Sequence, residues 1–210
     1  MKKVLALCIA VFLISGLASA QIVISEVYEA NGGSGKFVEL HNQTGSAIDL
    51  SAGNWDLLRF SNGGGAFTID LVGTVPANGF FVIGHSDVDG IFGAGTLDQT
   101  VTTVNHNGND TYELQEGGAT RDAFAGDNAA NGNDFAVDVV AFRVGSALPN
   151  NGDWGDSNQP MNGATSTSGN WIVFDITAAN ANAVATATPG TSGGAGGQEV
   201  PVELSSFSIE

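Results

Sequence analysis

The sequence predicts an all-β fold, a sandwich or a barrel, and three observations support this prediction. Apolar residues recur with a period of two along short runs, as expected for strands. Glycine supplies 30 of the 210 residues, about twice its usual share, which disfavours long helices. Asn-Gly pairs recur between the runs, and each pair can supply the positive φ angles of a tight turn.

The N-terminal segment, residues 1–20, has the three parts of a secretory signal peptide. It begins with Lys2 and Lys3, continues with an apolar run over 4–17, and ends on Ala-Ser-Ala at 18–20. We expect it to be removed and the mature chain to be secreted, to the extracellular space or a bacterial cell surface. The run is short for an N-terminal anchor. Because no other run approaches that length, no transmembrane anchor is expected in the mature chain.

The charge balance excludes two classes of partner. The chain has six basic and 22 acidic residues, a formal net charge of −16. Removal of the signal peptide takes Lys2 and Lys3, so the mature chain has four basic residues against 22 acidic ones, a net charge of −18. Binding to nucleic acid or to an anionic membrane depends largely on Lys and Arg, so neither is expected.

The mature chain is expected to form short strands joined by turns and loops. Ten runs bounded by Gly, Asn, Asp or Pro are the expected strands: 21–29, 36–41, 55–60, 67–72, 80–83, 101–104, 111–114, 135–144, 171–176 and 201–209. Three stretches are expected to be loops: 86–99, 117–134 and 145–170. The expected division is a sandwich over 21–191, a Gly-rich linker at 192–199 and a C-terminal strand segment at 200–210.

The order of the motifs resembles that of the lamin tail domain. The family's strands begin "I-x-E-V", "F-V-E-L-x-N" and "V-D-L-S-x-W-x-L", and it closes on "T-P-G". The matching segments here are 22–27, 37–42, 47–58, 73–84, 109–114, 137–142 and 187–190, which together span about 21–191. The chain departs from the pattern in its three long loops and at Asn54, where we expect a glycine before Trp55.

The resemblance implies an immunoglobulin-like β-sandwich with no catalytic apparatus. Bacterial members of this family resemble accessory or surface modules of secreted proteins. The expected function is therefore a non-catalytic structural module of the cell surface or extracellular matrix. The alternative is an accessory module that recognises a glycan, or docks a secreted hydrolase, through the 86–99, 117–134 and 145–170 loops.

The residues themselves do not indicate an enzyme. Ser86 has His85 and Asp87 as its neighbours, but adjacent side chains on extended backbone point apart and cannot form a catalytic relay. Glu26 and Glu39 could face each other on paired strands, as glycosidase carboxylates do. In a sandwich we expect this pair to face solvent or to bond a turn. No catalytic residue is therefore predicted.

Calcium is the candidate cofactor, because three Gly-rich loops concentrate the oxygen ligands that this ion prefers. The candidate ligands are Asp87, Asp89, Asp127, Asn131, Asp134, Asp153 and Asp156. The alternative is that these residues only form turns, since Asp, Asn and Gly are common turn residues.

The C-terminal segment is the candidate contact with another copy of the chain. Its apolar residues need burial, and they follow a flexible arm: Val200, Val202, Leu204, Phe207 and Ile209. The segment can fold back on its own sandwich, or it can add to the edge of another subunit and build a filament. Trp154, in a polar loop, is a second candidate contact with a partner protein or glycan.

Overall fold

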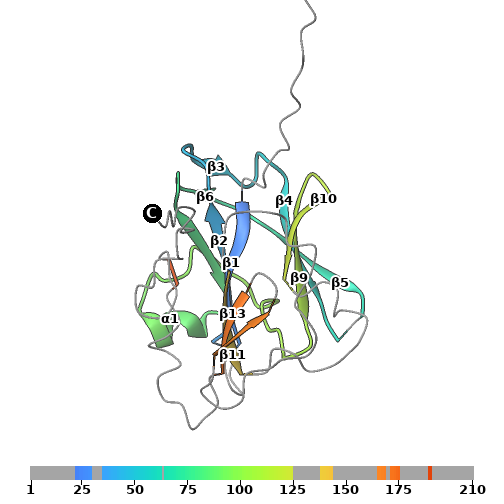
Figure 1. Cartoon of the computed structure of the whole chain (residues 1–210). Helices are drawn as coiled ribbons and strands as arrows, with labels where there is room; N and C mark the ends of the chain where they lie inside the picture. Colours follow the sequence, from blue (N-terminus) through green and yellow to red (C-terminus); the bar gives the residue numbers. More distant parts are fainter. Residues whose placement is uncertain are drawn as a thin grey trace, which may run out of the picture.

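The computed structural model describes residues 22–29, 35–62, 64–124, 138–143, 165–168, 171–175 and 189–190, and these form an immunoglobulin-like β-sandwich (Figure 1). One sheet has seven strands in the order β12-β13-β11-β1-β2-β7-β8. The bounds of its strands are Thr165–Ser168 (β12), Trp171–Asp175 (β13), Val139–Arg143 (β11), Ile22–Tyr28 (β1), Phe37–Asn42 (β2), Phe80–Gly84 (β7) and Gln99–Thr100 (β8).

The second sheet has four antiparallel strands in the order β10-β9-β4-β5. Their bounds are Ala119–Phe124 (β10), Thr111–Glu116 (β9), Trp55–Phe60 (β4) and Ala66–Asp70 (β5). A small ribbon pairs β3 (Ile48–Asp49) with β6 (Thr74–Val75), and helix α1 spans Asp87–Phe92. The strands of the larger sheet are also antiparallel to their neighbours, except that β8 runs parallel to β7.

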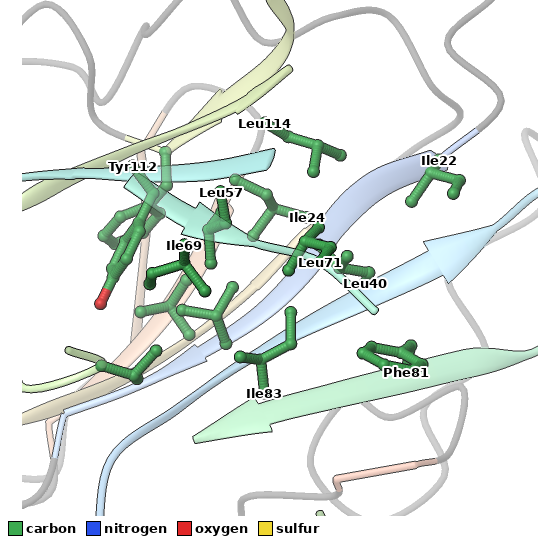
Figure 2. Packing of buried hydrophobic residues seen from close by; sticks show 14 of the residues in the cluster. Ile22, Ile24, Leu40, Leu57, Ile69, Leu71, Phe81, Ile83, Tyr112 and Leu114 are labelled. Carbon is green, nitrogen blue, oxygen red and sulfur yellow. The ribbon is translucent and has the colours of Figure 1, made fainter. Parts of the chain in front are cut away.

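The main core lies between the two sheets (Figure 2). Because side chains alternate across a strand, every second residue of β1, β2, β4 and β9 points inward. Ile24, Leu40, Leu57 and Leu114 are all fully buried there. Each such burial stabilises the fold by about 1.5–3 kcal/mol. The chain has no cysteine outside its N-terminal segment, so this packing takes the place of disulfides.

A second, smaller core lies on the opposite face of the seven-stranded sheet, beside helix α1. Tyr28 stacks on Phe37 at 5.4 Å between ring centres, and Phe92 of the helix packs edge-on against both rings. Val82 and Val88 belong to the same cluster. The central strands are therefore buried on both faces, which explains why residues 22–28 are apolar on both sides.

Eight of the ten predicted strands are confirmed, with shifts at their ends. Residues 101–104 do not form a strand, because the pairing with β7 is limited to β8. Val101 still donates a backbone hydrogen bond to the carbonyl of Gly84 at 2.9 Å, and Val104 is fully buried. The apolar pattern therefore identified buried residues here without identifying their backbone conformation. The expected strand at 201–209 lies outside the described residues.

Each of the three expected loops contains regular structure. The 117–134 stretch begins with β10, which pairs with β9 across a turn at Gly117 and Gly118. Both glycines have positive φ, 57° and 79°, as a two-residue hairpin turn of the primed type requires. The 86–99 stretch holds α1 and the first residue of β8, and the 145–170 stretch holds β12. The loop prediction was wrong for these segments, whose polar sequences lack a clear apolar alternation.

Two of the three Asn-Gly asparagines that the structure describes adopt the expected left-handed conformation. Asn62 has φ 51° and Asn78 has φ 52°. Asn107 does not; its backbone N–H instead donates to Asp110 Oδ2 at 3.2 Å. Asn54 also has a positive φ, 55°. The position before Trp55 thus needs a left-handed residue, which explains how asparagine replaces the expected glycine.

Candidate functional site

The first acidic pair predicted to bind calcium lies at the start of helix α1. The Asp87 side chain is about half exposed. Asp89 Oδ1 accepts a hydrogen bond from the backbone N–H of Leu97 at 3.1 Å, so this carboxylate fastens the segment that follows the helix. The other predicted ligands and contact residues lie outside the described residues: Asp127, Asn131, Asp134, Asp153, Asp156, Trp154, Val200, Val202, Leu204, Phe207 and Ile209. Within the described ranges, no three His, Cys, Asp or Glu residues gather in a way that could hold a metal ion.

The His85-Ser86-Asp87 string has no catalytic geometry. His85 Nδ1 lies 3.5 Å from Asp87 Oδ1 and accepts a hydrogen bond from the Asp87 backbone N–H at 3.3 Å. Because Nδ1 accepts this bond, neutral His85 carries its proton on Nε2. A histidine base oriented by a carboxylate needs the opposite tautomer. The His–Asp contact is therefore a local feature of the turn into α1.

Glu26 and Glu39 do lie opposite each other on β1 and β2, as the sequence suggested. They do not face solvent, however, because each has an exposed fraction of only 1%. The prediction that such a residue bonds a turn is confirmed for Glu39. Its Oε2 accepts the backbone N–H of Gly190, and its Oε1 accepts the Ser25 hydroxyl, both at 2.6 Å. Glu39 thereby fastens the Pro189–Gly190 turn to the outer face of the seven-stranded sheet.

A buried polar cluster, here called the Lys36 cluster, connects the two sheets at one end of the sandwich. It comprises Glu29, Lys36, His106 and Tyr112. Lys36 Nζ lies 2.7 Å from Glu29 Oε1 and also donates to the carbonyl of His106. Burial raises the pKa of Glu29, and the bond from Lys36 opposes that rise.

His106 is neutral in this cluster and has a defined tautomer. Its Nε2 lies 2.9 Å from the carbonyl oxygen of Tyr28, which can only accept, so Nε2 carries the proton. Its Nδ1 therefore accepts the hydroxyl of Tyr112 at 2.8 Å. Burial, with the positive charges of Lys36 and Arg59, lowers the pKa of His106 to about 3. The imidazole serves as a neutral hydrogen-bonding link.

A second buried group, here called the Arg143 cluster, connects β10 to β1 and β11. Asp122 Oδ2 accepts from Arg143 Nη2 at 2.5 Å and from the backbone N–H of Ile24 at 2.7 Å. Arg143 Nε donates to the carbonyl of Ile24 at 2.6 Å, and the guanidinium carbon lies 4.7 Å from the centre of the Trp171 ring. The β1–β2 register shifts just after Ile24, and these side chains satisfy its backbone there.

These polar side chains are therefore structural. The bonds that connect the sheets join residues far apart in the sequence, such as Lys36 with His106, Tyr28 with His106, and Ile24 with Arg143. Sequence reasoning missed both clusters, although Lys36 and Arg143 are two of only four basic residues after the N-terminal segment. The signal that could have revealed these clusters was a rare basic residue inside or beside an apolar strand.

The family comparison agrees with this reading. The family model of the lamin tail domain matches residues 16–190. The chain belongs to the lamin tail domain family. No curated protein matches it. The family is one of non-enzymatic, immunoglobulin-like domains. In the part of this lamin tail domain that the structure describes, no helix has the length and apolar character needed to cross a membrane.

The asparagine that ends the "F-V-E-L-H-N" motif of this lamin tail domain has a structural role. Asn42 is fully buried. Its Nδ2 donates to the carbonyls of Ser46 and Pro76 at 2.8 and 2.9 Å, and its Oδ1 accepts the backbone N–H of Thr44 at 2.9 Å. One side chain thus joins the turn after β2 to the turn after β6.

The edge strand β5 of this lamin tail domain is mostly exposed. Among the described strands, β5 pairs only with β4. Leu71 donates its backbone N–H to the carbonyl of Trp55 at 3.0 Å, so odd-numbered residues bond toward β4 and even-numbered residues direct their backbone groups away from it. Phe67 faces the same side as Leu57 and Ile69, yet it is 47% exposed. The Arg59 guanidinium carbon lies 5.0 Å from the centre of the Phe67 ring, so the inner layer is only partly covered at this edge.

Proposed function

We propose that this lamin tail domain is a secreted structural module of the cell surface or extracellular matrix, and that copies assemble through the C-terminal segment 200–209. The observation that carries the proposal is the open edge of β5, because an exposed strand edge is a template for another strand. The apolar alternation of the C-terminal segment supplies such a strand. A non-catalytic role is supported by two further points. The buried side chains of the Lys36 and Arg143 clusters bond other parts of the fold, and the family is non-enzymatic.

The test compares the mature chain, 21–210, with a chain that ends at Gln198. Light scattering and electron microscopy should show oligomers or filaments of the mature chain and monomers of the shortened one. Leu204→Asp, on the apolar side of the segment, should abolish assembly, because it places a charge in a buried contact. Glu203→Gln, on the other side, is the matched control and should assemble as the natural chain does.

Two results would overturn this proposal. One is a mature chain that stays monomeric at every concentration tested, and the other is a shortened chain that assembles equally well. Monodisperse particles that bind defined glycans on an array would instead favour the accessory binding module.

Calcium binding is a separate proposal, supported by the exposed carboxylate of Asp87 and by the oxygen-rich sequences around residues 127–134 and 153–156. Titration calorimetry of the mature chain with CaCl₂ tests it, with MgCl₂ as the control because Mg²⁺ accepts fewer ligands in a stricter geometry. Heat of binding together with a higher melting temperature supports the site. No heat and no shift in melting temperature would remove it.

A further inference from the structure

We infer that the acceptor for the C-terminal segment is the open edge of β5, Ala66–Asp70, in a second copy of the chain. This inference rests on the proposed self-assembly and specifies where the segment binds. Among the described strands, the other edge of the four-stranded sheet is β10, and that edge is not available. Asp122 of β10 bonds the backbone of Ile24 in β1 and the side chain of Arg143 in β11.

The backbone of β5 is positioned to accept a strand. Because its even-numbered residues direct N–H and C=O away from β4, Ala66 and Thr68 present both groups at the open edge. Both residues are exposed. At the far end of the strand, the Gln99 side chain already occupies this edge. Its Nε2 donates to the carbonyl of Asp70 at 2.8 Å, and its Oε1 accepts the backbone N–H of Val72 at 3.0 Å.

Gln99 therefore shows two things about the edge. Its amide bonds two outward-facing backbone groups in the way that a neighbouring strand would, which confirms the direction of these groups. It also limits the acceptor to the part of the edge from Ala66 to the N–H of Asp70. A short apolar segment such as 200–204 matches that length.

The side chains at the edge favour an apolar donor. Phe67 points to the inner layer but is 47% exposed. A strand added to β5 would continue the inner layer beside Phe67. The alternation of Val200, Val202 and Leu204 places three apolar side chains on one face of the donor, suited to pack against the part of the ring that Arg59 leaves exposed.

The position of Gly190, which precedes the arm, favours donation to a neighbour. Gly190 is bonded to Glu39 on the outer face of the seven-stranded sheet, whereas β5 belongs to the other sheet. Figure 1 shows the short red-orange segment at 189–190 and β5 on opposite sides of the molecule. The arm at 191–199 spans at most about 30 Å when fully extended. Donation to a second copy needs no path around the sandwich, and repetition of this head-to-tail contact builds an open filament.

The test blocks the edge and the segment separately. Thr68→Pro removes an N–H that points away from β4, so it should weaken self-association at least tenfold and leave the hairpin with β4 intact. Thr68→Val keeps the backbone donor and is the matched control. Each melting temperature is measured by circular dichroism.

Mixing two defective chains gives the decisive result. The chain that ends at Gln198 keeps its β5 edge, and full-length Thr68→Pro keeps its C-terminal segment. We expect each to be a monomer alone and the mixture to form a one-to-one dimer that grows no further. A cooperative melting transition of the Thr68→Pro chain, measured by circular dichroism, shows separately that this chain is folded.

The outcomes separate this inference from the proposed function. If full-length Thr68→Pro assembles as well as Thr68→Val, the segment binds elsewhere, and the β5 inference is wrong while self-assembly stands. If Thr68→Pro stays monomeric but the mixture forms no dimer, the inference that the segment binds β5 of a second copy is wrong. If the natural mature chain never assembles, the proposed function fails, and this inference fails with it.

Discussion

The two edges of the four-stranded sheet are built in opposite ways. At β10, Asp122 and Arg143 bond to each other and to the backbone of Ile24, and so join this sheet to the other one. At β5, apolar side chains are exposed, and the Gln99 amide alone bonds the outward backbone among the described residues. Buried polar side chains therefore close one edge. At the other edge, the described residues connect to the larger sheet only through Gln99 at the Asp70 end, so the Ala66–Thr68 part stays open to a further strand.

The largest expected effect comes from breaking the closed edge. Asp122→Asn removes the charge partner of buried Arg143, and loss of one member of a buried pair costs about 3–5 kcal/mol of unfolding free energy. Urea denaturation measures it. The neighbouring pair Arg121–Glu116, 2.9 Å apart and partly exposed, is the control, and Arg121→Ala should cost less than about 1 kcal/mol. Equal costs for the two variants would contradict the structural importance of the Arg143 cluster.

The second prediction concerns pH and the Lys36 cluster, which also connects the sheets. The unfolded chain protonates a histidine near pH 6.5, whereas the pKa of folded His106 is about 3. The unfolded state therefore binds the extra proton between these values, so the stability contributed by His106 is lost as pH falls from about 6.5 toward 3. Between pH 7 and pH 4 the loss attributable to His106 reaches about 3 kcal/mol.

Denaturant unfolding of the natural chain and of His106→Gln at several pH values measures this loss. The variant should be destabilised at pH 7 and should depend less on pH. The raised pKa of Glu29 acts with the opposite sign and is common to both proteins, so it cancels in the comparison. A natural chain and variant with parallel pH profiles would contradict the buried neutral state of His106.

The third prediction compares two side chains on the open strand itself. Ile69 is buried, so Ile69→Ala should cost about 2–4 kcal/mol of unfolding free energy. Phe67, on the same face but 47% exposed, should cost less than about 1.5 kcal/mol when changed to alanine. For self-association, measured by sedimentation velocity or light scattering, Phe67→Ala should have the larger effect, because only Phe67 is exposed to a donated strand. Phe67→Ala with unchanged association would weaken the case for β5.

The smallest expected effect is that of salt on assembly. The mature chain is expected to carry a net charge of −18, and like charge opposes dense association. Raising NaCl from about 0.05 M to about 0.5 M shortens the screening length severalfold and should strengthen self-association. Light scattering across the salt series measures it. Weaker association at high salt would instead indicate a contact held by opposite charges.

The sequence predicted the positions of most strands well, but it predicted less well which residues are buried and which residues bond to each other. The alternation in β1, β2, β4 and β9 identified strands, because period two and turn residues act locally. It missed β10, whose sequence Ala-Thr-Arg-Asp-Ala-Phe alternates poorly, although Gly117 and Gly118 marked its hairpin turn. It also placed the Glu26–Glu39 pair correctly across two strands but misjudged its burial.

The sequence by itself determined the all-β class, the left-handed turns at Asn62 and Asn78, and membership of the lamin tail domain family. Each of these depends on residues within a few positions of one another, or on the order of short motifs. Tertiary structure alone decided which charges are buried. Arg143 bonds Ile24 across 119 positions, and Gly190 bonds Glu39 across 151. Burial of a polar group depends on what distant segments bring to it, and no local pattern encodes that.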